Sequence, residues 1–389
     1  MYDYIVIGAG WAGCVIAREL AEKTDSKVLV VERRNHIAGN AYDEFDDGIL
    51  IQKYGPHFLA TSQWNVIEYV SKFGKLYEMP IEALSYVDDK YVARPYNLRT
   101  LQQLVGAENS YDLINELRNQ FGQQRRVSLF DLTSSENSSI RKYGQLLYEK
   151  LYAPYVAKQW GVRVNEIDRG VINRSQIVLG YDTQLVELDY QYLPQDGYTS
   201  IMKNILNHPN ISLELKTDGL KNISFDNQIN KVLYCGHKCR GIIFTGQIDE
   251  LFENRLGELP YRSRYFEYKK YQKDRVYPCG VVTYPQQYEY IRTTEFKQFN
   301  PHKEEIEYSI VQYEYSCGYD IKADKGNEPY YPIISEKNIA LYQHYKCLAD
   351  KYDNLYLCGR LAEYKYLDMD TTILHAFSVA KQIIDKDIT

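Results

Sequence analysis

The stretch Tyr2–Asn40 restricts the fold of this 389-residue chain more than any other part of the sequence. The apolar run Tyr4–Ile7 predicts a strand buried on both faces, and it leads directly into Gly8-Ala-Gly-Trp-Ala-Gly13. Apolar residues then recur at four-residue spacing, which predicts a helix packed on the sheet. A second buried strand follows over 27–31 and ends at Glu32. These elements in this order predict a βαβ unit.

Each residue type in this unit suits the binding of a dinucleotide. Gly8 allows a tight turn, Gly10 lets backbone N–H groups approach a pyrophosphate, and Gly13 lets helix and strand pack closely. The helix N-terminus brings partial positive charge to the phosphates. Glu32 is placed to accept hydrogen bonds from a ribose diol. Because all these parts fall in register, we interpret the segment as a dinucleotide-binding site rather than a glycine-rich turn without a ligand.

The residues after Glu32 favour FAD over NAD. Arg33 begins a basic loop that runs to Gly39 and Asn40. This loop resembles that of FAD enzymes of the glutathione-reductase type, in which the chain after the acidic residue folds back over the cofactor. The resemblance implies that Gly39 and Asn40 lie against the diphosphate of FAD.

Charge and cysteine usage exclude several classes of protein. The net charge of −6 provides no basic field for nucleic acid, so an anionic small substrate would require a local cluster of arginines. No run reaches the ~18 apolar residues of a membrane span, and no signal peptide precedes the first strand. The seven cysteines form an odd, irregularly spaced set that is typical of reduced thiols. We therefore expect a cytoplasmic protein without membrane insertion.

Two other features are weaker signals. The chain contains 39 tyrosines, whose amphipathic rings suit a wet cleft or an interface as well as a core, although compositional drift explains most of them equally well. Cys235-Gly-His-Lys-Cys239 faintly resembles a zinc site. Two nearby ligands on an expected hairpin are too few, so we expect no metal.

The order of patterns along the chain predicts one coenzyme domain that is interrupted twice. Buried strands return near residues 240–246 and 354–359, while helical spacing with capping residues and a helix-breaking Pro154 marks an insertion. The predicted fold class is α/β, a Rossmann-like domain with a helical insertion and an antiparallel sheet domain. The expected domains are the FAD-binding domain (1–75, 190–250 and 335–389), the helical insertion (98–170) and the antiparallel substrate domain (76–97, 171–189 and 251–334).

Four later motifs, taken with the N-terminal segment, point to one family. They are Tyr155-Val-Ala-Lys-Gln-Trp160-Gly, Arg174, Asn327-Glu-Pro-Tyr-Tyr-Pro332 and Gly359-Arg-Leu-Ala-Glu-Tyr-Lys-Tyr-Leu-Asp-Met369. Together they resemble UDP-galactopyranose mutase, and the resemblance extends over essentially the whole chain. It implies an isomerase that interconverts the pyranose and furanose forms of a nucleotide sugar on reduced FAD, without net redox change. The flavin N5 would displace the nucleoside diphosphate from the anomeric carbon and form a covalent adduct with the sugar.

The resemblance also implies which residues form the site. Two arginines would clamp the diphosphate, two tyrosines would hydrogen-bond it, and a histidine would face the isoalloxazine ring as a donor. These catalytic candidates are Arg174, Arg292, Tyr330, Tyr366 and His57. The substrate-binding candidates are Tyr155, Trp160, Leu185, Ala60, Ile81 and Asp368. The candidates for FAD binding are Gly8, Gly10, Gly13, Glu32, Arg33, Gly39, Asn40, His57, Arg360, Asp368 and Met369.

Four positions depart from the family pattern. Ala60 stands where the family has a second histidine, Ile81 matches an asparagine and Ile67 a tryptophan. Leu185 replaces a tyrosine that helps to hold the nucleotide. A less polar site suits a sugar that has lost a hydroxyl, because an unpaired buried polar group costs about 1–3 kcal/mol. We therefore place dTDP-fucopyranose, a 6-deoxy sugar nucleotide, narrowly ahead of UDP-galactopyranose.

Other functions stay open on the sequence. Space beside Ala60 would also suit an N-acetylated sugar such as UDP-N-acetylgalactosamine. An FAD-dependent amine oxidase shares the N-terminal fold but has no use for paired arginines. A silent relative would bind a nucleotide sugar without converting it. By family resemblance we expect a homodimer formed through the helical insertion, and a loop near 160–174 that closes over the substrate to exclude water.

Overall fold

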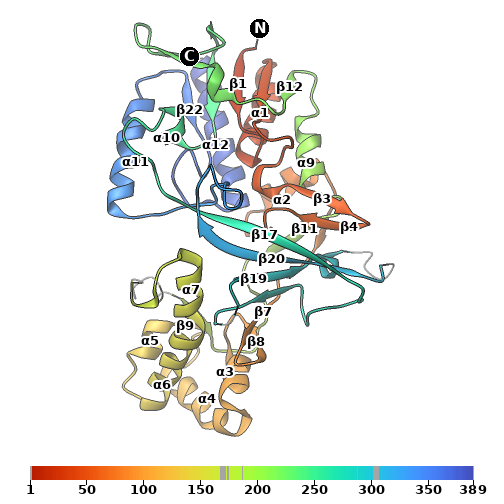
Figure 1. The fold of residues 1–389 in the computed structure, drawn as a ribbon, viewed down its shortest axis with the longest axis vertical. Coiled ribbons are helices and arrows are strands. Elements are labelled where there is room, and N and C mark those ends of the chain that lie inside the picture. The colour runs from red at the N-terminus through yellow and green to blue at the C-terminus, as the bar shows by residue number, and fades with distance from the viewer. Residues whose placement is uncertain are drawn as a thin grey trace.

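The computed structural model describes residues 2–166, 172, 175–185, 187–286, 288–300 and 306–388. Its upper part in Figure 1 contains a five-stranded sheet in which every neighbouring pair of strands is parallel. The strands, in spatial order, are β12 (Ile211–Glu214), β2 (Val28–Val31), β1 (Tyr4–Ile7), β16 (Gly241–Phe244) and β22 (Leu355–Leu357).

Helices cover both faces of this parallel sheet. Tyr4 and Val6 face a core shared with α1 (Trp11–Thr24), α9 (Gly197–Leu206) and α12 (Met369–Ile388). Ile5 and Ile7 face a second core, formed with α10 (Ile248–Leu251) and α11 (Glu336–Ala349). Burial on both faces explains why the strands are uninterrupted apolar runs. The predicted mixed α/β class with a Rossmann-like domain is confirmed.

A seven-stranded sheet crosses the middle of the molecule (Figure 1). Its neighbouring strands are antiparallel, except for the parallel pair β18 and β7. The strands, in spatial order, are β21 (Tyr331–Pro332), β17 (Tyr261–Tyr271), β20 (Ser309–Gly318), β19 (Arg292–Glu295), β18 (Val281–Thr283), β7 (Ala83–Val87) and β8 (Lys90–Arg94). The predicted site residue Arg292 therefore lies on the central part of this sheet.

A helical lobe forms the lower end of the molecule in Figure 1 and has a hydrophobic core of its own. Its helices are α3 (Leu98–Val105), α4 (Ala107–Phe121), α5 (Leu129–Thr133), α6 (Ser138–Leu147) and α7 (Ala153–Trp160). Asn137 caps α6 by accepting hydrogen bonds from the backbone of Ser139 and Ile140. A π-helical turn over Tyr148–Tyr152 separates α6 from α7, just before Pro154. The predicted division of the helix at Pro154 is confirmed. Its cause is that proline has no N–H to continue the helical hydrogen bonds.

Smaller elements connect these parts. They are the sheet of β5 (Leu59–Thr61), β11 (Tyr190–Pro194) and β6 (Leu76–Glu78), the pair β3 (Asp43–Asp46) and β4 (Ile49–Gln52), the pair β9 (Arg126–Ser128) and β10 (Gln176–Val178), the meander β13 (Ile223–Asp226), β14 (Lys231–Tyr234) and β15 (His237–Lys238), and helix α2 (Trp64–Ser71). The first of these sheets carries Ala60 on β5.

The closing helix α12 starts at Met369, and the carbonyl oxygen of Asp368 accepts the N–H of Thr372. The Thr371 hydroxyl donates to the same carbonyl, 3.0 Å away. Within the described part of the chain, no helix is both long and apolar enough to cross a membrane.

Candidate active site

The glycine turn after β1 forms an open backbone cradle. Gly8 has a φ of +108°, and a Cβ there would lie 2.0 Å from Thr245 Oγ1. A Cβ on Gly13 would lie 1.9 Å from the carbonyl oxygen of Gly8, so the helix needs a glycine to approach the strand. A Cβ on Gly10, by contrast, would meet nothing closer than Gly39 Cα at 3.8 Å. Gly10 is therefore the position where a ligand, rather than the protein, requires a glycine.

The N-terminus of α1 is available to a phosphate group. Its N-cap residue, Gly10, provides no side-chain cap, so the first N–H groups of the helix keep their bonding capacity. Gly39 packs against Gly10, with only 3.1 Å between its ideal Cβ and Gly10 Cα. The loop after β2 therefore returns to the glycine turn. This arrangement fits a dinucleotide diphosphate held between two backbone segments.

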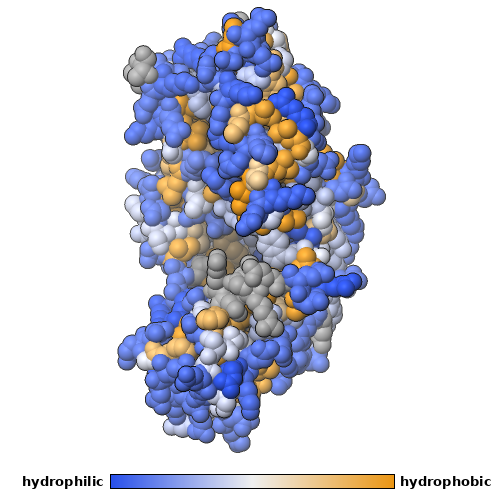
Figure 2. Space-filling model, turned by 90° about the vertical axis from the view of Figure 1, so that its left-hand side faces the viewer, coloured by the Kyte–Doolittle hydropathy of each residue, from blue (hydrophilic) through white to orange (hydrophobic). Residues whose placement is uncertain are grey.

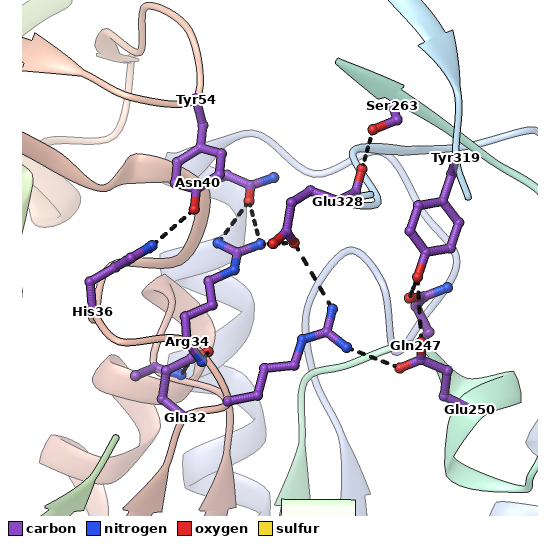
Figure 3. A network of polar contacts seen from close by, with 12 residues as sticks. Glu32, Arg34, His36, Asn40, Tyr54, Gln247, Glu250, Ser263, Tyr319 and Glu328 are labelled. Carbon is purple, nitrogen blue, oxygen red and sulfur yellow. Dashed lines mark hydrogen bonds and ion pairs between the residues drawn. The ribbon is translucent and has the colours of Figure 1, made fainter. Parts of the chain in front are cut away.

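Glu32 connects the glycine turn to that second loop. Its Oε2 accepts the Ala9 N–H and its Oε1 accepts the Arg34 N–H, each at 2.9 Å. Each carboxylate oxygen still has a lone pair for a ribose hydroxyl. Arg33 points to Glu250 at 3.3 Å, while Arg34 reaches Asn40 and Glu328 (Figure 3).

Two arginine side chains pair with one carboxylate on the antiparallel sheet, and a third arginine lies against the same tyrosine ring as one of them. Arg292 Nε donates to Glu314 Oε2 at 2.7 Å, and Arg264 Nε lies 3.3 Å from Glu314 Oε1. Arg264 and Arg360 lie over the same Tyr331 ring, 5.5 and 5.1 Å from its centre. The group therefore carries more positive than negative charge. This excess is the local cation cluster that an acidic chain requires for an anionic substrate.

Arg264 and Glu314 are deeply buried. Their side chains are 7% and 4% exposed, so their ion pair is shielded from water. Two nitrogens of Arg264 have no hydrogen-bond partner among the described residues. Sequence reasoning missed Arg264, Glu314 and Tyr331. Arg264 lies two residues after Arg262 within an apparent strand, and only the pairing of β17 with β20 shows what it faces.

His57 lies in the loop next to this cluster and is held as a neutral ring. Its Nδ1 lies 2.8 Å from the carbonyl oxygen of Gly55 and donates to it. Burial lowers the pKa of His57 to about 4, and the nearby charges of Arg360 and Arg292 add to that effect. The free Nε2 is an acceptor in this tautomer, whereas we expected a donor to the cofactor.

The predicted aromatic residues meet at the edge of the same sheet. Trp160, at the end of α7, contacts Tyr366 edge to face, with 6.5 Å between ring centres. Tyr366 is 48% exposed and donates to the carbonyl oxygen of Pro332 at 2.9 Å. Burial of part of the ring raises the pKa of Tyr366 to about 12. Tyr330 is only 3% exposed, and its hydroxyl has no partner among the described residues.

The position of α7 is fixed by contacts with β17 and β20. Arg262 Nε and the Ser316 hydroxyl both donate to the carbonyl oxygen of Gln159, at 3.0 and 2.7 Å. Arg94 lies 4.8 Å above the ring of Tyr155 and covers one face of it. Where α7 approaches β17 and β20, the surface is hollowed between the upper part and the helical lobe (Figure 2).

Three of the positions that depart from the family pattern come together. Ala60 on β5 pairs with Gln191 on β11, and the side chain of Gln191 accepts the Ile81 N–H at 2.9 Å. The N–H of Leu185 donates to the carbonyl oxygen of Ile81 at 2.9 Å. Ile67 does not belong to this group. It is 3% exposed in the core beneath α2, so our inclusion of it among the residues around the sugar is wrong.

The remaining candidates lie apart from the arginine group or outside the described residues. Arg174 falls outside the residues that the structure describes. Asp368 is exposed just before α12, and Met369 packs at the edge of the coenzyme core. The cysteines of the faint zinc motif, Cys235 and Cys239, are free thiols on opposite sides of a hairpin.

The cradle, Glu32 and the returning loop define a dinucleotide-dependent enzyme with a Rossmann-like coenzyme domain. Residues 6–73 match the model of an NAD(P)-binding Rossmann-like domain, and residues 150–366 match the model of UDP-galactopyranose mutase. The UDP-galactopyranose mutase of Mycoplasma pneumoniae is 31% identical over 98% of this chain and 96% of its own. A dTDP-fucopyranose mutase of Escherichia coli is 34% identical over 99% of both chains.

This chain therefore belongs to the UDP-galactopyranose mutase family, whose members are flavin-dependent isomerases. Membership implies that FAD occupies the Rossmann-like domain, and the open Gly10 cradle fits it. A crystal structure of reduced UDP-galactopyranose mutase has the same fold, with a TM-score of 0.69 at 14% identity over 99% of this chain and 94% of that one.

Proposed function

We propose that this protein interconverts the pyranose and furanose forms of a nucleotide sugar on reduced FAD, with dTDP-fucopyranose narrowly favoured as substrate. The observation that carries the proposal is the cluster in which Arg264 and Arg292 pair with Glu314 and Arg360 shares the Tyr331 ring with Arg264. Guanidinium groups suit the oxygens of a nucleoside diphosphate. The cationic substrate of an amine oxidase would be repelled by the same charges, which argues against that alternative.

The chain's own residues would bind and orient the substrate. Glu314 fixes the guanidinium of Arg292, so this cation is held in place before the diphosphate arrives. The unpartnered hydroxyl of Tyr330 offers a buried donor to the same ligand. Neutral His57 adds no charge beside the cofactor. When bound, reduced FAD supplies the nucleophile that displaces the diphosphate from the anomeric carbon.

The preference for a 6-deoxy sugar rests on Ala60 and Ile81, which stand where the family has polar side chains. Both contact Gln191: Ala60 pairs with it across β5 and β11, and the Gln191 side chain accepts the Ile81 N–H. A sugar without the 6-hydroxyl leaves fewer polar atoms unpaired in such surroundings. Loss of the tyrosine at position 185 would also leave room for the methyl group of thymine.

UDP-galactopyranose is the second candidate. Its support is the set of relatives named UDP-galactopyranose mutase, such as the one from Mycoplasma pneumoniae at 31% identity. The identity to a dTDP-fucopyranose mutase is 34%. This value is too close to 31% for the comparison to decide between the two substrates. A direct comparison of turnover is therefore required.

The test uses the purified, dithionite-reduced protein with dTDP-fucofuranose and UDP-galactofuranose in parallel, and follows pyranose formation by chromatography. We expect a kcat/KM about tenfold higher for the dTDP sugar. Leu185→Tyr should reverse part of that preference, while the exposed-site variant Arg99→Lys should leave it unchanged. A higher kcat/KM for the UDP sugar would establish the second candidate. Conversion of neither, with tight UDP binding, would indicate a silent relative.

We further propose a homodimer formed through the helical lobe. Two large apolar side chains on this lobe are exposed, Tyr111 on α4 at 70% and Phe130 on α5 at 55%. Exposed aromatic residues of this kind are common at subunit interfaces.

A further inference from the structure

Three segments that are far apart in the sequence meet in one network of polar contacts (Figure 3), next to the predicted catalytic residue Tyr330, whose ring packs on Tyr54. They are the loop after β2, which carries Arg34, the segment before His57, which carries Tyr54, and the loop before β21, which carries Glu328. The first comes from the coenzyme half of the molecule, and the last belongs to the antiparallel sheet. The contacts among them therefore join the cofactor site to the substrate site.

Arg34 is the centre of this meeting point. Two nitrogens of its guanidinium lie 3.3 and 3.2 Å from Asn40 Oδ1, and it forms an ion pair with the Glu328 carboxylate. The guanidinium also lies 4.8 Å from the centre of the Tyr54 ring. Its side chain is only 14% exposed, so these contacts are shielded from water. An ion pair in such surroundings holds its partners more firmly than one at the surface.

Glu328 is separated from Tyr330 by a single residue, Pro329, and this short segment is anchored to β17. The carbonyl oxygen of Glu328 accepts the Ser263 hydroxyl from β17, and the Tyr330 N–H donates to the carbonyl oxygen of Arg262 at 2.9 Å. The Tyr330 ring packs 6.4 Å from the ring of Tyr54, which Arg34 covers. Glu328 thus constrains the backbone of Tyr330, and Tyr54 constrains its ring.

The tip of Tyr330 has no such support. Its hydroxyl is buried and has no hydrogen-bond partner among the described residues. The direction of the hydroxyl therefore depends on the ring contacts and on the chain segment that begins at Glu328. A donor reserved for a ligand must be oriented in this way, because a protein partner would compete with the ligand.

We propose that Arg34 and Glu328 are positioning residues that orient Tyr330 toward the nucleoside diphosphate across the cofactor site. The substrate named in this inference rests on the proposed function, whereas the orientation of Tyr330 does not. Loss of the Glu328 charge would release the loop before β21 and allow the Tyr330 ring to shift, while the arginine group around Glu314 stays in place.

The outer part of the same network provides a matched control. Arg33 lies 3.3 Å from Glu250, and the Tyr319 hydroxyl lies 3.4 Å from that carboxylate. The Arg33 side chain is 40% exposed, so this pair is more screened by water than the inner one. Arg33 also lies 4.0 Å from Glu328, and Glu250→Gln removes one charge from the outer part of the network while the contacts of Arg34, Tyr54 and Tyr330 stay in place.

The first experiment places 3-fluorotyrosine at position 330 of the FAD-bound protein and records its fluorine NMR spectrum. We expect one sharp resonance in the parent protein and in Glu250→Gln, and a shifted or broadened resonance in Glu328→Gln. FAD content, measured by absorbance, should be equal in all three proteins. An unchanged resonance in Glu328→Gln would overturn the inference, whatever the substrate is.

The second experiment measures binding of dTDP and of UDP by calorimetry in a double-mutant cycle. Glu328→Gln should weaken binding of the nucleoside diphosphate about tenfold, and Tyr330→Phe by a similar factor. The double variant should be no weaker than Tyr330→Phe alone, because Glu328 acts through Tyr330. Multiplication of the two effects would overturn the inference. If the parent protein binds neither dTDP nor UDP, the proposed function fails, while the fluorine spectra still decide the orientation of Tyr330.

Discussion

Arg292 and Glu314 lie directly opposite each other on β19 and β20, and the Arg292 Nε donates to Glu314 Oε2 at 2.7 Å. The same carboxylate pairs with Arg264 from β17 through its other oxygen. One buried acid therefore orients two guanidinium groups. Glu314 is 4% exposed, so its removal would leave these cations without compensation in surroundings that exclude water.

Glu314→Gln should impair both stability and activity. The substitution keeps the shape of the side chain but removes the charge, so Arg264 becomes an uncompensated buried cation. We expect a loss of about 3 kcal/mol in the free energy of unfolding, measured by urea denaturation, and a fall in kcat/KM of at least about tenfold. Glu267→Gln on β17, which removes a pair with Lys325 at 50% exposure, should change stability by less than about 1 kcal/mol. Equal effects of the two substitutions would contradict the role assigned to Glu314.

Alanine at two glycines of the turn should separate folding from cofactor binding. Gly13→Ala places a methyl group 1.9 Å from the carbonyl oxygen of Gly8, so we expect a loss of about 3 kcal/mol in stability. Gly10→Ala meets no protein atom within 3.8 Å and should leave the free energy of unfolding of the FAD-free protein unchanged within about 1 kcal/mol. The Gly10 variant should nevertheless lose most of its bound FAD, as judged by flavin absorbance. Retention of full FAD content would show that the cradle is not the diphosphate site.

The pKa of His57 predicts how stability depends on pH. Its pKa is about 4 in the folded protein, below its ordinary 6.5, because the ring is buried. The unfolded chain therefore binds a proton first as the pH falls through 6.5, and stability is lost from there down to about pH 4. Between about pH 8 and about pH 5 the native protein should lose about 2 kcal/mol more than His57→Asn. The free energies of unfolding are measured by urea denaturation at both pH values. An equal loss between these pH values in the two proteins would exclude this assignment.

The exposed aromatic residues of the helical lobe predict where the subunits meet. Phe130→Asp should convert a dimer to a monomer in light scattering, because a charge at the centre of an apolar contact is costly to bury. The control is Phe45→Asp in the coenzyme half, since Phe45 on β3 is equally exposed at 57%. Phe45→Asp should leave the dimer intact. A monomeric mass for the parent protein would refute the proposed dimer.

The local elements of this fold could be predicted from the sequence. The βαβ unit follows from an apolar run, three glycines and an acid that lie within one short stretch. Asn137 as a helix cap and the division of the helix before Pro154 also depend on hydrogen bonds between residues close in the chain. Such features need no knowledge of which distant segments pair.

The arrangement of the candidate site was decided by the tertiary structure. Alternation along a strand indicates that Arg264 and Arg262 share a face, but only the antiparallel register of β17, β20 and β19 places Glu314 between Arg264 and Arg292. The sequence also did not predict where Ile67 lies, because its burial in the coenzyme core depends on the packing of α2. The sequence by itself determined the coenzyme-binding unit and the family, since both rest on local patterns. The charge cluster exists only because β17, β20 and β19 pair side by side, and the Arg34–Glu328 bridge joins residues that are 294 positions apart in the chain.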